Sequence, residues 1–180
     1  MNTLENCLTE VTDAANRVAD NLVDIRDTII CPHDFTWVNR SSEWVNEKLS
    51  VIPNWNKGVY RFPLDGGSPN AYWTLSLEDA VKFVDWCWIT NIQYVINRWD
   101  CENFGVGFTA LSLLFHHFAN KFGWNSAGMV MDWSGHHGYN IILTSIGDVY
   151  LVEIQNKRIW SLANHDYQGA YKLETADILF

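Results

Sequence analysis

The chain has 180 residues, of which 48% are hydrophobic and ten are tryptophan. This composition supplies enough apolar side chains for a buried core and argues against intrinsic disorder. The net charge of −9 lacks the basic excess typical of nucleic-acid-binding proteins, so we expect no nucleic-acid partner.

Residues 1–30 repeat apolar side chains at alternating steps of four and three, a spacing typical of a coiled coil. The repeating side chains are Leu4, Leu8, Val11, Ala15, Val18, Leu22, Ile25 and Ile29. Leucine at two of the four a positions, with β-branched residues at three of the four d positions, favours three or four strands. We therefore expect a homo-oligomer, with a trimer favoured, formed through residues 4–29. An amphipathic helix packed on its own domain is the alternative.

A proline-containing region follows and is expected to consist of loops around one short helix. Pro32 ends the first helix, and all four prolines lie at or before residue 69. The short helix is predicted at Ser42–Leu49. The sequence from Ser76 to Asp79 has the form of a capping box, which opens a second helix. The side chains expected on its buried face are Val81, Val84, Trp88, Ile92 and Val95.

The sequence from Cys101 onward predicts one long helix and then strands. The helix is expected from Cys101 to Phe122, with Gly123 as its stop. The strands are expected at Ala127–Asp132, Tyr139–Thr144 and Asp148–Ile154. Helices followed by an antiparallel sheet indicate the α+β class. We expect two parts: an N-terminal heptad helix over residues 1–30, and one domain over residues 31–180.

Cys101 has the position of a nucleophilic thiol. Asp100 is a good N-cap, which puts Cys101 in the first helical turn, where the helix dipole favours a thiolate. Free backbone amides in that turn can also bind an oxyanion. The acids Asp100 and Glu102 oppose the thiolate, and a buried cysteine without reactivity is the alternative. The other cysteines have neither zinc nor disulfide-framework spacing: Cys7, Cys31 and Cys87.

A histidine and a glutamate are expected to meet across a hairpin. Glu153 follows His137 by 16 residues, and a turn near residue 145 brings the two side by side. Val149 and Leu151, which lie on the same face of the strand as Glu153, are apolar, so Glu153 is expected to be buried and to need a partner. Gln155 projects from the same face and is a further candidate for the hydrogen-bond network. His136 competes with His137 for the role of base, and an exposed histidine without a role is the alternative for either.

Three short motifs in this order resemble a known family. They are Asp100–Phe104, His137–Asn140 and Glu153–Gln155. The sequence over residues 40–160 is similar to the papain-like cysteine peptidase domain at the C-terminus of the Marasmius oreades agglutinin and its phage-encoded relatives. The resemblance implies a papain-like fold, in which a central cysteine-bearing helix packs on an antiparallel sheet. The N-terminal coiled-coil helix would precede this domain.

The resemblance also implies roles for individual residues. Cys101 would be the nucleophile, His137 the general base and later acid, and Glu153 the residue that orients the imidazole. A glutamine before the cysteine completes the oxyanion hole in papain, and Gln93 and Asn97 are the candidates here.

Two differences from the family limit what is carried over. Asn103 stands where an acidic residue is common, and the agglutinin's sugar-binding domain has no counterpart, so sugar binding is not expected. Calcium dependence in the agglutinin suggests a metal role, with Asp100 and Glu102 as the first candidates. No cofactor is otherwise required.

The expected function is therefore a cysteine hydrolase, a peptidase or amidase, acting on a peptide or other amide. The family's distribution and the coiled coil suggest a phage-encoded or virion-associated protein, with other virion proteins as further partners. The alternatives are a catalytically silent structural or adaptor virion protein and a peptidoglycan amidase or endopeptidase. We expect location in the host cytoplasm or virion, because the sequence lacks a signal-peptide pattern and an apolar run of the roughly 20 residues that cross a membrane.

Overall fold

The structure, a computed structural model, describes residues 34–53, 55, 72–96, 100–118 and 124–179. The predicted coiled coil over residues 1–30 lies outside these residues and stays a prediction. Among the described helices, none combines the length and the apolar character that crossing a bilayer requires.

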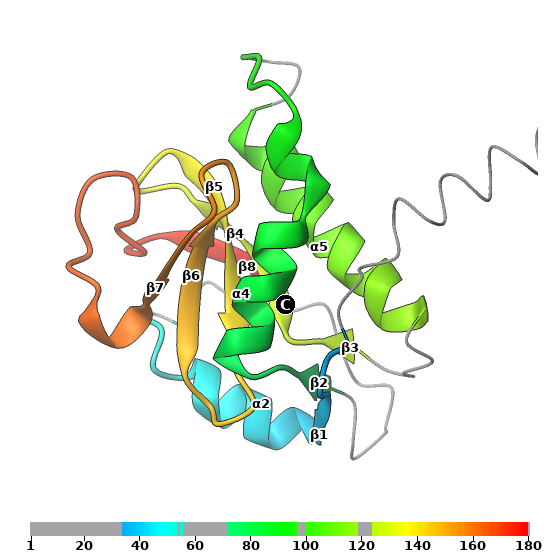
Figure 1. Ribbon diagram of the computed structural model, residues 1–180. Helices are drawn as coiled ribbons and strands as arrows, with labels where there is room; N and C mark the ends of the chain where they lie inside the picture. The colour runs from blue at the N-terminus through cyan, green and yellow to red at the C-terminus, as the bar shows by residue number, and fades with distance from the viewer. Residues whose placement is uncertain (1–33, 54, 56–71, 97–99, 119–123, 180) are drawn as a thin grey trace, which may run out of the picture. The chain divides into compact units, whose positions relative to one another are not determined.

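The centre of the domain is an antiparallel sheet of five strands in the order β7-β6-β5-β4-β8 (Figure 1). Its strands are β4 (Ala127–Asp132), β5 (His137–Leu143), β6 (Val149–Glu153), β7 (Arg158–Ser161) and β8 (Ala176–Leu179). β4 has the predicted bounds, whereas β5 begins two residues earlier than expected, at His137 itself. The sequence did not predict β7 and β8, which are four-residue strands at the two sheet edges.

Among the described residues three helices pack on this sheet, and the first, α2 (Ser42–Leu49), has the predicted bounds. Its N-cap is Ser41, whose hydroxyl accepts a hydrogen bond from the Trp44 amide at 3.2 Å. Val45 and Leu49 are buried and join the core formed by the central strands.

The second helix, α4 (Leu77–Trp86), begins as the capping box predicts but buries a different face. Ser76 Oγ accepts a hydrogen bond from the Asp79 amide at 3.0 Å. Of the five side chains predicted on the buried face, Val84 is buried, whereas three are exposed: Val81 at 37%, Trp88 at 38% and Val95 at 40%. Ala80 and Phe83, which the sequence did not predict, are buried together with Val84.

Beyond Trp86 the prediction was wrong because the helical period does not continue through the segment. Cys87 has a ψ of 107°, which ends the helix, and a 3-10 turn, η1 (Trp88–Asn91), follows. Residues beyond Trp86 therefore leave the phase of α4.

The third helix, α5 (Cys101–Phe118), carries the cysteine and lies against β4 and β5 (Figure 1). The predicted end of this helix falls outside the described residues. The buried Asn140 side chain fixes the helix to the sheet, because its Nδ2 donates to the carbonyls of Gly105 at 2.9 Å and Gly128 at 3.0 Å.

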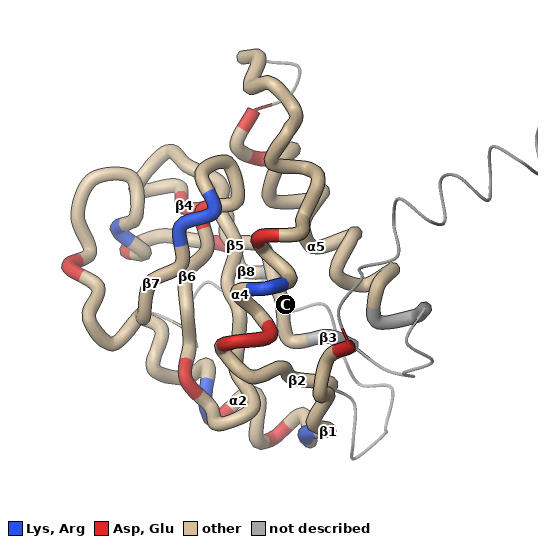
Figure 2. The backbone as a smooth tube through the Cα atoms, in the orientation of Figure 1, with Lys and Arg blue, Asp and Glu red and all other residues tan. Residues whose placement is uncertain are grey.

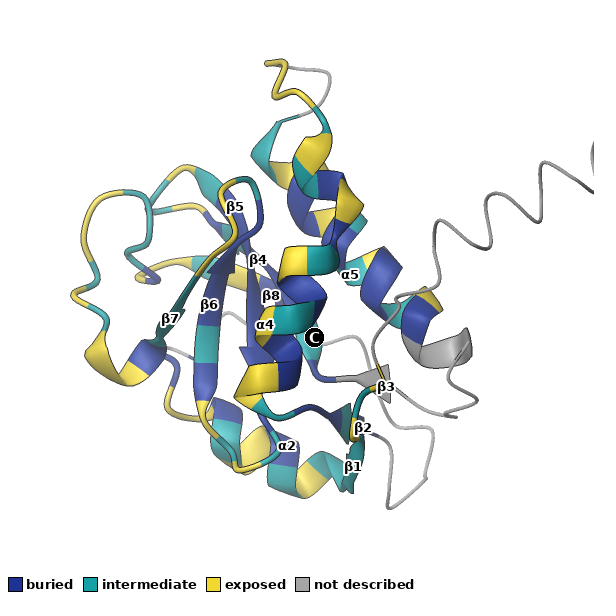
Figure 3. Cartoon of the chain, in the orientation of Figure 1, coloured by how far each residue is buried: buried dark blue, intermediate teal, exposed yellow. Residues whose placement is uncertain are grey.

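Successive residues of β5 face two different partners. Gly138 and Asn140 contact α5, whereas Tyr139, Ile141 and Leu143 belong to the core cluster on the side of α2. The central strands are buried along most of their length (Figure 3). Burial on both faces makes β5 a rigid platform, with His137 at its first position.

A second, smaller sheet takes two of its three strands from the region that the sequence indicated as loops, and its third strand follows α5. It consists of β1 (Val38–Arg40), β2 (Tyr72–Thr74) and β3 (Trp124–Asn125), in that order. Strands of two or three residues are too short to show an alternating pattern, which explains why the sequence did not reveal them.

Candidate active site

Cys101 is the first residue of α5 and packs against the strand that carries His137. The Phe104 amide donates to the Asp100 carbonyl at 3.1 Å, and the Asn103 side chain accepts from the Asp100 amide at 3.2 Å. This geometry is that of an N-cap at Asp100, as the sequence indicated. A Cβ on Gly138 would lie 3.3 Å from the Cys101 carbonyl carbon, so the missing side chain allows the close packing.

The surroundings of Cys101 favour the neutral thiol. Burial raises the pKa of the Cys101 thiol above its ordinary value, and the Glu102 carboxylate raises it further. Hydrogen bonds from the Gly138 and Glu102 backbones lower the pKa without reversing the direction. Cys101 Sγ lies 3.3 Å from Glu102 Oε2 as a donor, and Figure 2 shows acidic positions at the start of α5. The thiolate expected from the helix dipole alone is therefore not the resting form.

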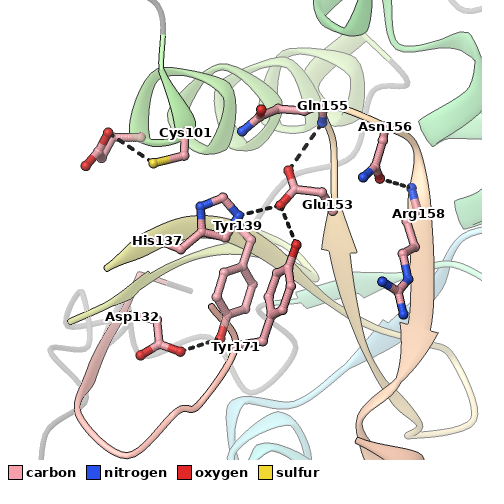
Figure 4. Close-up of polar contacts among 10 residues, drawn as sticks. Cys101, Asp132, His137, Tyr139, Glu153, Gln155, Asn156, Arg158 and Tyr171 are labelled. Carbon is pink, nitrogen blue, oxygen red and sulfur yellow. Dashed lines mark hydrogen bonds and ion pairs between the residues drawn. The ribbon is translucent and has the colours of Figure 1, made fainter. Parts of the chain in front are cut away.

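His137 and Glu153 form the closest polar pair of the site. His137 Nε2 lies 2.5 Å from Glu153 Oε2, and the Glu153 side chain is only 5% exposed. Because a buried carboxylate accepts the Nε2 proton, Nδ1 is left as the basic nitrogen of the neutral ring. In Figure 4 the His137 ring stands between Cys101 and Glu153, with this second nitrogen on the side of Cys101. No hydrogen bond joins the Cys101 thiol to His137 among the described residues.

The pair forms across the hairpin with a register shifted by two residues from the expected one. Asn140 lies opposite Val152, which places Tyr139, rather than His137, directly opposite Glu153. His137 and Glu153 are thus diagonal neighbours on one face, close enough for long side chains to meet. The neighbours of Glu153 with the same parity, Val149 and Leu151, are buried, as the alternation predicted.

His136 lies in the turn before β5 and does not contact this pair. It is exposed and has a φ of 53°, in the left-handed region. The structure therefore brings together Cys101, His137 and Glu153, and leaves His136 outside the group.

The three candidates for oxyanion binding or orientation have different positions. Gln93 is exposed in the segment after η1, and Asn97 lies outside the described residues. The Gln155 backbone amide lies 3.4 Å from Glu153 Oε1, and its side chain extends toward α5 and Cys101 (Figure 4). Gln155 is thus the one of the three that the described part of the chain brings to the site.

The candidate metal ligands Asp100 and Glu102 do not form a cluster. Within the described ranges, no group of three or more His, Cys, Asp or Glu side chains is arranged to hold a metal ion. The Glu102 carboxylate instead accepts the Cys101 thiol hydrogen bond. The described residues therefore do not form a preassembled calcium site. A role for calcium stays a prediction.

Sequence reasoning missed two residues that complete the environment of Glu153. The Tyr171 hydroxyl donates to Glu153 Oε2 at 2.9 Å, from the segment between β7 and β8. Asp132, at the end of β4, accepts the Leu173 amide at 2.8 Å and so holds the same segment. Tyr171 follows Glu153 by 18 residues through irregular structure, and no periodic pattern signals such a contact. In the sequence, Asp132 followed by Ser134 and Gly135 is a weak turn signal.

Comparison with known proteins gives a match in structure alone. No protein-family model and no curated protein matches the sequence. Two solved structures match with a TM-score of 0.57 and 18% identity over 79% of this chain. One is titled "PSL1a-E64 complex", and the other is a Polyporus squamosus lectin bound to the epitope Neu5Aca2-6Galb1-4GlcNAc. The match covers 51% and 49% of those chains, so this chain corresponds to about half of each. The chain therefore has a papain-like fold, similar to that of a fungal lectin.

Proposed function

We propose that this protein is a cysteine hydrolase that cleaves a peptide or another amide through Cys101, His137 and Glu153. The observation that carries the proposal is the 2.5 Å contact of His137 with the buried Glu153, beside the helix start that bears Cys101. Nucleophile, base and orienting acid are the three parts of a triad. The papain-like fold supports this assignment, because a structure of the same fold matches over 79% of this chain.

The reaction would begin with proton transfer from Cys101 Sγ to His137 Nδ1. The thiolate attacks the amide carbonyl carbon, and the C–N bond breaks as His137 returns the proton to the leaving amine. Water then attacks the thioester and gives its proton to His137, which releases the acid product and the free thiol. Glu153 stabilises the imidazolium that forms in both halves of the reaction. Backbone amides of the first turn of α5 and the Gln155 side chain are the candidate oxyanion donors.

Turnover with matched variants tests the proposal. A peptide or denatured-protein substrate should be cleaved by the wild type, and Cys101→Ser and His137→Ala should each lower kcat/KM by about a thousandfold or more. His136→Ala is the matched control, because His136 is exposed and outside the group. Cleavage that survives in Cys101→Ser would contradict the proposed function.

One observation favours a second candidate, a catalytically silent structural or adaptor protein. Burial and Glu102 hold the Cys101 thiol in its protonated form. A protonated thiol is compatible with a papain-like protein that does not catalyse a reaction. Absence of cleavage of peptides, denatured protein and peptidoglycan, together with slow alkylation of Cys101, would support this candidate. Cleavage of peptidoglycan alone would indicate the amidase or endopeptidase alternative. The phage origin, the virion location and the homo-oligomer remain proposals from the sequence.

A further inference from the structure

Tyr171 contacts two members of the proposed triad at once. Its hydroxyl lies 2.9 Å from Glu153 Oε2, the same carboxylate oxygen that His137 Nε2 approaches to 2.5 Å. Its ring also meets the His137 ring edge to face, with centroids 5.3 Å apart and an angle of 80°. Figure 4 shows the Tyr171 hydroxyl directed at the Glu153 carboxylate from the side opposite α5.

We propose that Tyr171 is a positioning residue, which fixes the Glu153 carboxylate and thereby sets the orientation and basicity of His137. The proposal rests on the proposed function, in which Glu153 orients the base. Its hydroxyl contacts Glu153, whereas its ring alone meets His137, so the effect of the hydroxyl passes through Glu153.

The phenol is a permanent donor in this setting. Burial, with Glu153 beside it, raises the pKa of Tyr171 to about 12. Tyr171 therefore stays protonated throughout the pH range in which a histidine base works. Since both lone-pair directions of Oε2 are then occupied, rotation of the carboxylate would break two hydrogen bonds together.

The segment between β7 and β8 holds Tyr171 from both sides. Before it, His165 accepts the Trp160 indole N–H on Nδ1 at 3.2 Å and donates from Nε2 to the Tyr171 carbonyl at 2.5 Å. After it, the Leu173 amide donates to the buried Asp132 at 2.8 Å. The backbone at Tyr171 is therefore fixed independently of its contact with Glu153, which is the property a positioning group requires.

The effect on His137 has a defined sign. Two donors share the charge of Oε2, so removal of the tyrosine hydroxyl leaves more negative charge for the imidazolium and raises the histidine pKa. The titratable groups near the His137 ring and Tyr171 are Cys101 on α5, Tyr139 on β5, Glu153 on β6, Arg158 on β7 and His165 after β7. Tyr171→Phe leaves all five unchanged.

The test is the NMR titration of His137 in the full chain, with its signal assigned by comparison with His137→Ala. In Tyr171→Phe the His137 pKa should rise by about half a pH unit or more. On the substrate of the turnover test, kcat should fall about tenfold while KM stays within about twofold. Tyr167→Phe is the matched control, since Tyr167 lies on the same segment and stacks on His165 without a contact to Glu153.

A second measurement keeps both the ring and the hydroxyl in place. Replacing Tyr171 by 3-fluorotyrosine strengthens the donor, so the His137 pKa should fall instead of rise. An unchanged His137 pKa in both variants would overturn the proposal, because a purely structural tyrosine would alter stability alone. The NMR result does not depend on turnover, so it separates failure of this inference from failure of the proposed hydrolase function.

Discussion

At the scale of single residues, the main tension lies between Cys101 and Glu102. A helix start favours a thiolate, whereas burial and a neighbouring carboxylate oppose it, and the pKa of Cys101 is raised. The 3.3 Å contact with Glu102 therefore opposes the ionisation of the Cys101 thiol that the proposed reaction requires.

Neutralising Glu102 should activate the thiol. Glu102→Gln removes the charge that raises the Cys101 pKa, so the midpoint of the alkylation rate with iodoacetamide should move to lower pH and the rate at pH 7 should increase. Mass spectrometry of alkylated peptides follows Cys101 directly. Cys87 is the internal control, because it is buried and its pKa is raised to about 11. The matched variant Glu47→Gln, on α2, should leave the Cys101 rate unchanged, and an equal rate in Glu102→Gln would contradict this account.

At the scale of elements, the site depends on how closely α5 approaches β5. Gly138→Ala would place a Cβ 3.2 Å from the Glu102 amide nitrogen, an atom of the helix backbone that cannot move without shifting α5. We expect a loss of about 1–3 kcal/mol in the free energy of unfolding and slower alkylation of Cys101.

Gly105→Ala is the contrasting variant on the same helix. Its Cβ would meet the flexible Met129 side chain at 3.2 Å, and the gain in helix propensity of about 1 kcal/mol offsets that contact. Urea unfolding should therefore show a much smaller loss for Gly105→Ala. Equal losses in the two variants would show that the close approach of Gly138 is unimportant.

Asp132 connects β4 to the segment that carries Tyr171, and its contribution should depend on pH. Burial opposes its charge, but hydrogen bonds from Ser134, Leu173, Gly135 and Tyr139 outweigh burial and lower its pKa. Because the folded-state pKa lies below the unfolded value of about 3.9, this stabilisation is complete above that value and is lost as the pH falls through the folded-state pKa.

Asp132→Asn tests this dependence. The variant should be less stable than the wild type by about 1–3 kcal/mol at pH 6, since an amide cannot accept four donors. The difference should shrink at pH 3, which lies below the unfolded-state pKa of about 3.9, because the carboxyl of the unfolded chain binds a proton there. Urea unfolding at the two pH values measures both quantities, and a difference independent of pH would refute the role of the charge.

The elements also show what the sequence could predict. Capping residues predicted the starts of α4 and α5, and a strand-like run predicted β4, because these signals act over a few neighbouring residues. The predicted face of α4 was wrong beyond Trp86, since a 3-10 turn ends the helical period there. Tyr171 could not be predicted, because its contact with Glu153 depends on the irregular path between β7 and β8.

At the scale of the whole molecule, all residues of the candidate site lie in the described domain. The N-terminal heptads would join several chains into an oligomer. If residues 4–29 form a coiled coil, sedimentation equilibrium should give the mass of a trimer, and deletion of residues 1–32 should give a monomer. The deleted chain should keep its rate of Cys101 alkylation, since the site belongs to residues 100–171. A full-length monomer would instead favour a helix packed on its own domain.

The most direct test of the whole account is covalent labelling with E64, an epoxide that alkylates thiols and whose complex gives one matching structure its title. Intact mass and peptide mapping after treatment near pH 7 should show one adduct, on Cys101. The rate should fall at least about a hundredfold in His137→Ala and remain unchanged in His136→Ala. No adduct on Cys101, or equal labelling in the two histidine variants, would contradict the claim that Cys101, His137 and Glu153 act as one site.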